Sequence, residues 1–291
     1  MIFTNRNLNY VNAPSFLNPQ TKKPIKPEQC IFLDVETVSG EKSFDDLPSD
    51  LQLRWVNKVE KWIKYSDSSK AKILDAVFQE FESQENNFDS KLLFDIYKKY
   101  QNSNPTEQYS QIAGLYPEFG KIVCISVGYY KDNEFQKITF VGDEYSLLSN
   151  FQFGINKIYE RLNNTYGDVW VVGHNVSFFD VPYITKRMAI NGLLTPSFLH
   201  QPFLQPWNKK IIDTATEWRV GNTTGDATLE TIMIVLNMEN PKNSVVNGEK
   251  MSEYYYSDVC DINVIADYCE NDVQSVKNLF VYLQNLKVCN I

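Results

Sequence analysis

The chain has 291 residues, of which 43% are hydrophobic and 22% charged, as in an ordinary globular protein. Its formal net charge of −8 argues against a protein that coats nucleic acid through phosphate contacts alone, since such proteins are usually basic. The five cysteines form no CxxC pair and only two histidines are present, which argues against a zinc cluster and favours free thiols in a reducing compartment.

The first 29 residues are polar and lack the apolar core of a signal peptide. No apolar run approaches the ~20 residues that a membrane span needs. We therefore expect a cytoplasmic protein without a membrane partner. We interpret residues 1–29 as an N-terminal arm and residues 30–291 as one domain.

The domain begins with a short buried strand, "CIFLDVE", at residues 30–36. From about residue 46 to residue 100 the apolar residues recur at helical spacing, and polar stretches divide them into three groups. The first group is Leu51, Trp55, Val59 and Trp62; the others lie at residues 73–81 and 92–100. We expect an insertion of two to three helices at about residues 41–116.

The rest of the chain alternates between strands and helices. Residues 121–130 and 135–142 predict a β-hairpin, and residues 168–175 predict a strand central in its sheet. Residues 209–215 predict a further short strand. Helices are expected at residues 146–162, 181–190, 226–236 and 262–286. Because a hairpin accompanies alternating strands and helices, the pattern indicates a mixed α/β sheet.

Two carboxylates end the first strand. Asp34 and Glu36 are two residues apart, so they project from one face of that strand. The spacing itself is common, and Asp132 with Glu134 repeats it in the predicted hairpin turn, where acids are solvated. The first pair differs because catalytic groups gather at strand ends in open α/β sheets.

Further acids follow in other elements. Asp180 opens the helix after the central strand and is expected to be its N-cap. Tyr268 and Asp272 are four residues apart and project from one face of the last helix, beside its buried stripe. Asp213 ends a short strand, and we interpret it as structural. His174 and Asn175 follow a strand end, where a turn hydrogen bond is the expected role.

Together these motifs resemble the DEDD 3′–5′ exonucleases in their tyrosine subclass, DEDDy. The matching features, in chain order, are Asp34-x-Glu36, the run H-N-x-x-F-F-D that ends at Asp180, and Tyr268-x-x-x-Asp272. The segments "PEFGKIVCISVGYY", "GHNVSFFDVPYITKR" and "YCENDV" are similar to exonucleases related to the exonuclease domain of family B DNA polymerases. The resemblance covers about residues 30–286, although the insertion is far larger than a minimal exonuclease carries.

The resemblance implies a ribonuclease H-like fold: a five-stranded mixed sheet flanked by helices, with the helical insertion after the first strand. It also implies hydrolysis of phosphodiester bonds from the 3′ end of DNA, with single-stranded DNA as the expected substrate. Nucleoside 5′-monophosphates would be released by a two-metal-ion mechanism. Such chemistry uses two divalent ions, Mg²⁺ or Mn²⁺, because carboxylate oxygens suit hard cations.

The resemblance also implies roles for individual residues. Tyr268 would orient the attacking water through its hydroxyl. The metal ligands would be Asp34, Glu36, Asp180 and Asp272. Contacts to the substrate would come from Thr37, Val38, His174, Asn175 and Phe179.

Three alternatives remain open at this point. An exonuclease of the same chemistry directed at RNA is one, because sugar choice depends on contacts to the 2′ position. A catalytically idle member that binds nucleic acid is another. The third is an interaction protein that uses the domain as a scaffold, since a fold alone does not determine function.

Overall fold

A computed structural model describes residues 10–12, 16–21, 23–65, 105–200, 204, 208–222, 228–238, 246–285 and 287–289. The chain divides into two compact units. The first unit comprises Met1–Glu36, Ile122–Asn247 and Asp261–Ile291, and the second comprises Thr37–Lys121 and Gly248–Cys260. The predicted stripes at residues 73–81 and 92–100 lie outside the described residues.

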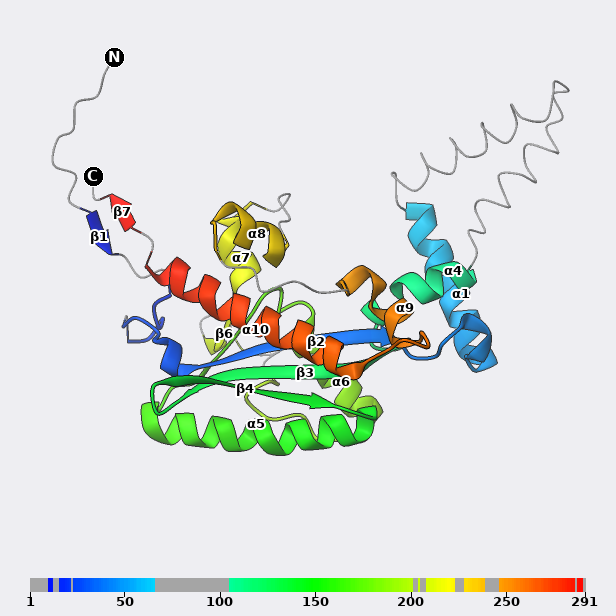
Figure 1. The fold of residues 1–291 in the computed structure, drawn as a ribbon, viewed down its shortest axis with the longest axis horizontal. Helices are drawn as coiled ribbons and strands as arrows, with labels where there is room; N and C mark the ends of the chain where they lie inside the picture. Colours follow the sequence, from blue (N-terminus) through cyan, green and yellow to red (C-terminus); the bar gives the residue numbers. More distant parts are fainter. Residues whose placement is uncertain are drawn as a thin grey trace, which may run out of the picture. The chain divides into compact units, whose positions relative to one another are not determined.

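The first unit centres on a five-stranded mixed sheet with the order β4-β3-β2-β5-β6 (Figure 1). The strands are β2 (Cys30–Ser39), β3 (Gly120–Lys131), β4 (Glu134–Val141), β5 (Trp170–Gly173) and β6 (Ile211–Asp213). β3 and β4 pair antiparallel, whereas β5 pairs parallel with both β2 and β6. The predicted fold class is therefore confirmed. β5 is a buried interior strand with a neighbour on either side, as predicted, although β2 is the middle strand of the sheet.

The predicted hairpin turns at Asp132 and Asn133, which connect β3 to β4. Both residues have positive φ angles, 54° and 67°, as a two-residue turn between twisted strands requires. Asp132 is exposed there and pairs with Arg161, so its carboxylate lies in solvent as expected for a hairpin-turn acid.

Helices cover both faces of this sheet (Figure 1). They are α5 (Glu144–Tyr166) and α6 (Asp180–Ile190) on one face, and α8 (Leu229–Val235) and α10 (Ile262–Gln284) on the other. The alternation of side chains along β2 assigns the faces. Ile31 and Leu33 pack with α5 and α6, whereas Cys30 and Phe32 pack with α8 and α10.

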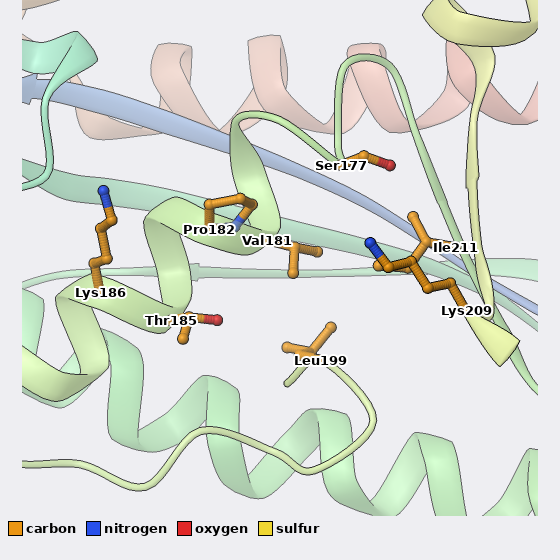
Figure 2. Close-up of a pocket in the computed structure, with 8 residues that line it drawn as sticks. All are labelled: Ser177, Val181, Pro182, Thr185, Lys186, Leu199, Lys209 and Ile211. Carbon is orange, nitrogen blue, oxygen red and sulfur yellow. The ribbon is translucent and has the colours of Figure 1, made fainter. Parts of the chain in front are cut away.

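The α6 side of the sheet continues to the outermost strand. Val181 of α6, Leu199 and Ile211 of β6 belong to one apolar cluster (Figure 2). Leu199 lies in the segment that leads from α6 to β6. The start of α6 is therefore packed against β6 through these apolar side chains.

Shorter elements complete the first unit. α7 (Thr214–Arg219) follows β6 directly, and a 3₁₀ turn at Pro27–Gln29 precedes β2. β1 (Tyr10–Asn12) pairs antiparallel with β7 (Lys287–Cys289) as a separate two-stranded sheet. Across the described parts of the chain, no helix combines the length and apolar character needed to cross a membrane.

The second unit is largely helical. It contains α1 (Ser49–Tyr65), α4 (Pro105–Ile112) and α9 (Met251–Tyr255), with 3₁₀ turns at Phe44–Asp46, Ala113–Leu115 and Gly248–Lys250. Trp55 of α1 is fully buried and contacts the rings of Tyr109 and Phe119 edge-on at 5.4 and 5.0 Å. Val59 is buried beside it, so the first predicted stripe forms a helix with a packed face.

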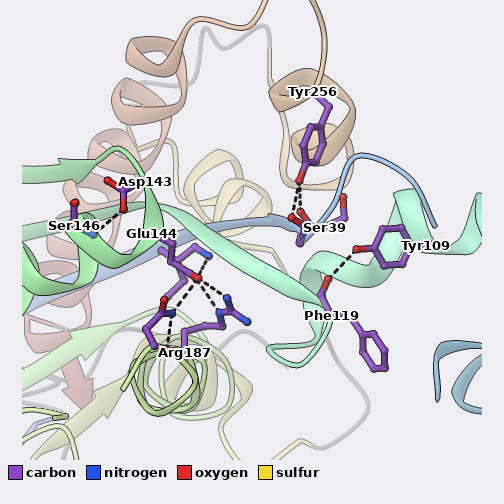
Figure 3. A network of polar contacts seen from close by, with 11 residues as sticks. Ser39, Tyr109, Phe119, Asp143, Glu144, Ser146, Arg187 and Tyr256 are labelled. Carbon is purple, nitrogen blue, oxygen red and sulfur yellow. Dashed lines mark hydrogen bonds and ion pairs between the residues drawn. The ribbon is translucent and has the colours of Figure 1, made fainter. Parts of the chain in front are cut away.

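Residues 248–260 join this unit through the end of β2. The Tyr256 hydroxyl donates to the carbonyls of Ser39 and Gly40 at 2.7 and 3.1 Å (Figure 3). The Ser39 amide donates to the Ser252 hydroxyl at 3.0 Å. These contacts span more than 200 residues of sequence, which explains why no local pattern predicted them.

An ion pair in the first unit fixes α6 (Figure 3). Glu144, the first residue of α5, accepts from the Ile122 amide at 2.8 Å and from Arg187 Nε at 2.8 Å. Its second oxygen accepts from Arg187 and from Asn191. Both charged side chains are nearly buried, with 13% and 11% exposed. The pair therefore ties α5, β3 and the end of α6 together.

We expect Glu144→Gln to lower the free energy of unfolding by about 3 kcal/mol, because it removes the negative charge that faces the nearly buried Arg187. Urea denaturation measures this difference. Asp132→Asn is the matched control, because it breaks a pair whose side chains are 76% and 45% exposed. Exposed ion pairs contribute little to the free energy of unfolding. Equal effects of the two substitutions would contradict this account of α6.

Candidate active site

The first acidic pair lies on the face of β2 that α10 covers. Asp34 and Glu36 continue the alternation of Cys30 and Phe32, and Glu36 is buried. Ligand atoms of Asp34, Glu36 and Cys269 lie within 4.8 Å of one another. The prediction that both acids share one face of the strand is confirmed.

Asp180 approaches the same stretch of β2 from α6. Its Oδ1 accepts from the backbone amide of Val35 at 3.1 Å, and the residue is only 3% exposed. The prediction that Asp180 is an N-cap is wrong. Phe179 occupies that position, and no side chain caps the helix there. Asp180 is the first helical residue, and its carboxylate interacts with its own amide and with the Val35 amide of the strand.

Tyr268 and Asp272 lie on α10, and each is 8% exposed. The stripe beside them, Ile265, Cys269 and Val273, is fully buried, as predicted. Asp272 lies close enough to β2 and α6 for its charge to raise the pKa of both Asp34 and Asp180. The structure thus brings the acids of all three motifs together.

Burial and like charge dominate the electrostatics of this cluster. Burial, Asp272 and Asp180 raise the pKa of Asp34 well above its usual range. Burial, with Asp213 and Asp272, raises the pKa of Asp180 to about 7, although hydrogen bonds from its own amide and from the Val35 amide oppose the shift. The cluster therefore holds its full negative charge only at an energetic cost unless a cation lies beside it.

Cys269 contacts Asp34, which the sequence did not predict. Its thiol donates to Asp34 Oδ2 at 3.2 Å. Burial raises the pKa of Cys269 well above its ordinary value, as do neighbouring Cys124 and Asp34. The protonated thiol thus acts as a hydrogen-bond donor to the carboxylate. A cysteine within an apolar stripe signals core packing, and only the fold reveals the acid beside it.

Asp213 holds the turn that precedes α6. Its carboxylate accepts from the amides of Asn175 and Ser177, each at 2.9 Å, and also caps α7 through Ala215 and Thr216. Asn175 has a φ angle of 64°, a left-handed conformation that asparagine tolerates. The structural interpretation of Asp213 agrees with this geometry, as does the expected turn hydrogen bond at Asn175.

The residues predicted to contact the substrate differ in burial and in their neighbours. His174 is partly buried and shares a 3.0 Å hydrogen bond with the Thr214 hydroxyl. Phe179 is partly buried against Tyr183, at 5.3 Å between ring centroids. Its neighbour Phe178 is 70% exposed and was not singled out from the sequence. An aromatic ring in solvent at this turn can meet a ligand without rearrangement.

Thr37 and Val38 belong to the second unit. Val38 is completely buried, and its backbone lies against Gly114. A β-carbon added to Gly114 would come within 3.1 Å of that backbone, so a larger residue there would have to displace it by a few tenths of an ångström. In this structure Val38 therefore presents no accessible surface to a substrate. Thr37 is partly exposed.

Comparison with known proteins identifies the family of the chain. A model of the RNase H superfamily matches residues 112–284, more than half of the chain, including Asp180, Tyr268 and Asp272. No curated protein matches the chain. Among solved structures, the family B DNA polymerase of the hyperthermophilic archaeon Pyrobaculum calidifontis is similar, with a TM-score of 0.41 and 16% identity.

That similarity covers 57% of this chain and 22% of the polymerase, so the chain spans about a fifth of its length. The family match has broader support in the structure, because the mixed five-stranded sheet with helices on both faces is the fold that the superfamily implies. The chain belongs to the RNase H superfamily.

Proposed function

We propose that the chain is a metal-dependent 3′–5′ exonuclease of the DEDDy type. It would remove nucleoside 5′-monophosphates from the 3′ end of single-stranded DNA. The observation that carries the proposal is the convergence of Asp34, Asp180 and Asp272 from β2, α6 and α10. Membership of the RNase H superfamily points to a nuclease in general.

The donor set fits divalent cations. Carboxylate oxygens are the ligands that Mg²⁺ and Mn²⁺ prefer, and a dication would offset the repulsion that raises the pKa of Asp34 and Asp180. Asp34, Glu36 and Asp272 would hold one ion, and Asp34 with Asp180 the other. Two such ions supply a hydroxide at neutral pH and stabilise the leaving oxygen.

The chain's own groups would orient these ligands and the water. The Val35 amide fixes the carboxylate of Asp180, and the Cys269 thiol fixes that of Asp34. Cys269 lies with Asp34 and Glu36 in the same group of possible ligands. Mg²⁺ and Mn²⁺ prefer oxygen to sulfur, so the carboxylates would be the ligands. Tyr268 would hold the attacking water through its hydroxyl. A phenol is a weak base but a good hydrogen-bond donor.

An exposed ring also supports a nucleic-acid substrate. Phe178 projects from the turn that Asp213 holds in place, two residues before Asp180. Bases stack on aromatic rings whatever their identity. We propose that Phe178 contacts a base near the reacting end, in addition to the partly buried Phe179.

The test uses single-stranded DNA and RNA of one sequence, labelled at either end, with Mg²⁺ or Mn²⁺. The proposal predicts that the 3′ label is released as a mononucleotide, while the 5′-labelled strand shortens in a ladder. Preference for DNA is the expected result. Faster degradation of RNA than of DNA would support the proposed reaction but show that RNA is the substrate. Internal cleavage, or no cleavage, would reject the proposal of an exonuclease.

We expect Asp34→Asn and Asp272→Asn each to slow 3′-end degradation by at least about 10³-fold, since metal ions contribute several kcal/mol to such barriers. The control is Asp132→Asn, which changes an acid in the same sequence pattern at an exposed turn. Product analysis on gels measures all three rates. An unchanged rate in the Asp34 variant would overturn the assignment.

For Tyr268→Phe we expect roughly 10²-fold slower hydrolysis, because only the hydroxyl that positions water is lost. Mn²⁺ titration of the same variant should give the wild-type affinity. A loss of Mn²⁺ binding would show that Tyr268 supports the ligands rather than the water.

The metal-free protein should be more stable at pH 5 than at pH 8. The folded pKa of Asp180 is about 7, above its unfolded value, so only the folded state binds this proton between those values. The free energy of unfolding therefore falls as pH rises, by up to about 1.4 kcal/mol per pH unit. Urea unfolding in EDTA should show a shallower slope for Asp180→Asn, and an unchanged slope would contradict this.

A further inference from the structure

We propose that a pocket between α6 and β6 binds a nucleotide, meaning an aromatic base that carries a phosphate. The choice of a nucleotide rests on the proposed function. The pocket has a volume of about 430 Å³, within the usual range for small-molecule sites. It lies on the side of the sheet where α6 packs, whereas Asp34 and Glu36 face α10.

The floor of this pocket is apolar. It consists of Val181, Leu199 and Ile211, of which Leu199 is only 1% exposed (Figure 2). These side chains already belong to the core, so the floor is fixed before a ligand arrives. A flat ring that covers such a surface removes apolar area from water and gains free energy in proportion to that area.

The rim is cationic. Lys209 and Lys186 stand at opposite ends of the lining, and Lys209 extends across the pocket toward Val181 (Figure 2). The remaining polar groups include the hydroxyl of Thr185. No acid is among the described lining residues, although the chain as a whole carries a net charge of −8. The local charge therefore favours an anion.

Lys209 differs from its neighbour in how its charge is balanced. Lys210 pairs with Asp168 at 2.6 Å. Within the described part of the chain, Lys209 has no ion pair, and it is partly buried at the edge of an apolar floor. An ammonium group in this position binds phosphate well, because a charge-assisted hydrogen bond strengthens as water is displaced.

The pocket is linked to the acidic cluster through the first turn of α6. Asp180 reaches β2, and the next residue, Val181, lines the pocket. Ser177 also lines the pocket, and its amide is held by Asp213. The ligand could be a released nucleoside 5′-monophosphate or a nucleotide within a bound strand. Both present the same chemistry, so binding experiments must separate them.

The test is calorimetric titration of the full chain in EDTA. Without divalent ions the acidic cluster repels phosphate, so binding reports on the pocket rather than the active site. The probes are dAMP, deoxyadenosine, inorganic phosphate and the strand (dA)₆. We expect dAMP to bind saturably, and deoxyadenosine and phosphate to bind at least about tenfold more weakly, because each lacks one half of the recognised group.

Three variants assign that binding. Lys209→Gln should weaken dAMP binding by roughly tenfold, as expected for a lost charge-assisted hydrogen bond. Thr185→Phe should block it by filling the pocket while both lysines remain. Lys131→Gln is the control, since this lysine is exposed on β3 and outside the pocket. Asp34→Asn should leave dAMP affinity unchanged.

These experiments test the pocket separately from the proposed exonuclease function. If (dA)₆ binding depends on Lys209 and dAMP does not bind, the strand is the ligand and the proposal stands. If neither probe depends on Lys209 or Thr185, the proposal is overturned. If Asp34→Asn nevertheless abolishes the nuclease activity of the protein, the proposed exonuclease function would still hold without the pocket. If binding depends on Lys209 but the wild-type protein has no nuclease activity, the proposed exonuclease function would be rejected and the nucleotide-binding pocket would be supported.

Discussion

Repulsion among carboxylates that converge on the middle of β2, which continues to Ser39, is the constraint on which the site depends. Asp34, Asp180 and Asp272 come from three elements, and each raises the energy of its neighbours' charged forms. Folding tolerates such a cluster only if the surrounding frame holds it rigidly. An arrangement that disfavours its own charge is suited to binding a dication, because the cation removes the repulsion.

Hydrogen bonds from neutral donors supply part of that frame. The Val35 amide holds Asp180, and the Cys269 thiol holds Asp34. Asp213 lies nearby, and its carboxylate accepts from four backbone amides, two in the turn before α6 and two at the start of α7. At the other end of the same helix, Glu144 and Arg187 join α6 to α5 and β3. The protein itself therefore supplies hydrogen bonds that orient Asp34 and Asp180.

Local periodicity was sufficient to predict much of the fold. Strand alternation placed Asp34 and Glu36 on one face, and helical spacing placed Asp272 beside the buried stripe of α10. The N-cap preference of aspartate misled the interpretation of Asp180, because a partner 145 residues earlier in the chain takes its carboxylate instead. A propensity averages over many contexts, and here a tertiary contact overrides it.

Contacts between distant segments account for the other features that the sequence did not predict. Residues 248–260 join the second unit through Tyr256 and Ser252, which no spacing in their own segment indicates. The contact of Cys269 with Asp34 is of the same kind, since 235 residues separate the two. The exposure of Phe178 rather than Phe179 also depends on how the turn is held. Two adjacent phenylalanines in sequence carry no sign of which one packs.

Anomalous scattering from crystals soaked in Mn²⁺ tests the central claim most directly, because it locates the ions independently of activity. The account predicts a strong peak within coordination distance of the Asp34 carboxylate, shared with Glu36 or Asp272, and its disappearance in Asp34→Asn. Peaks confined to exposed acids such as Asp132, with none at Asp34, would contradict the assignment of this cluster as the metal site.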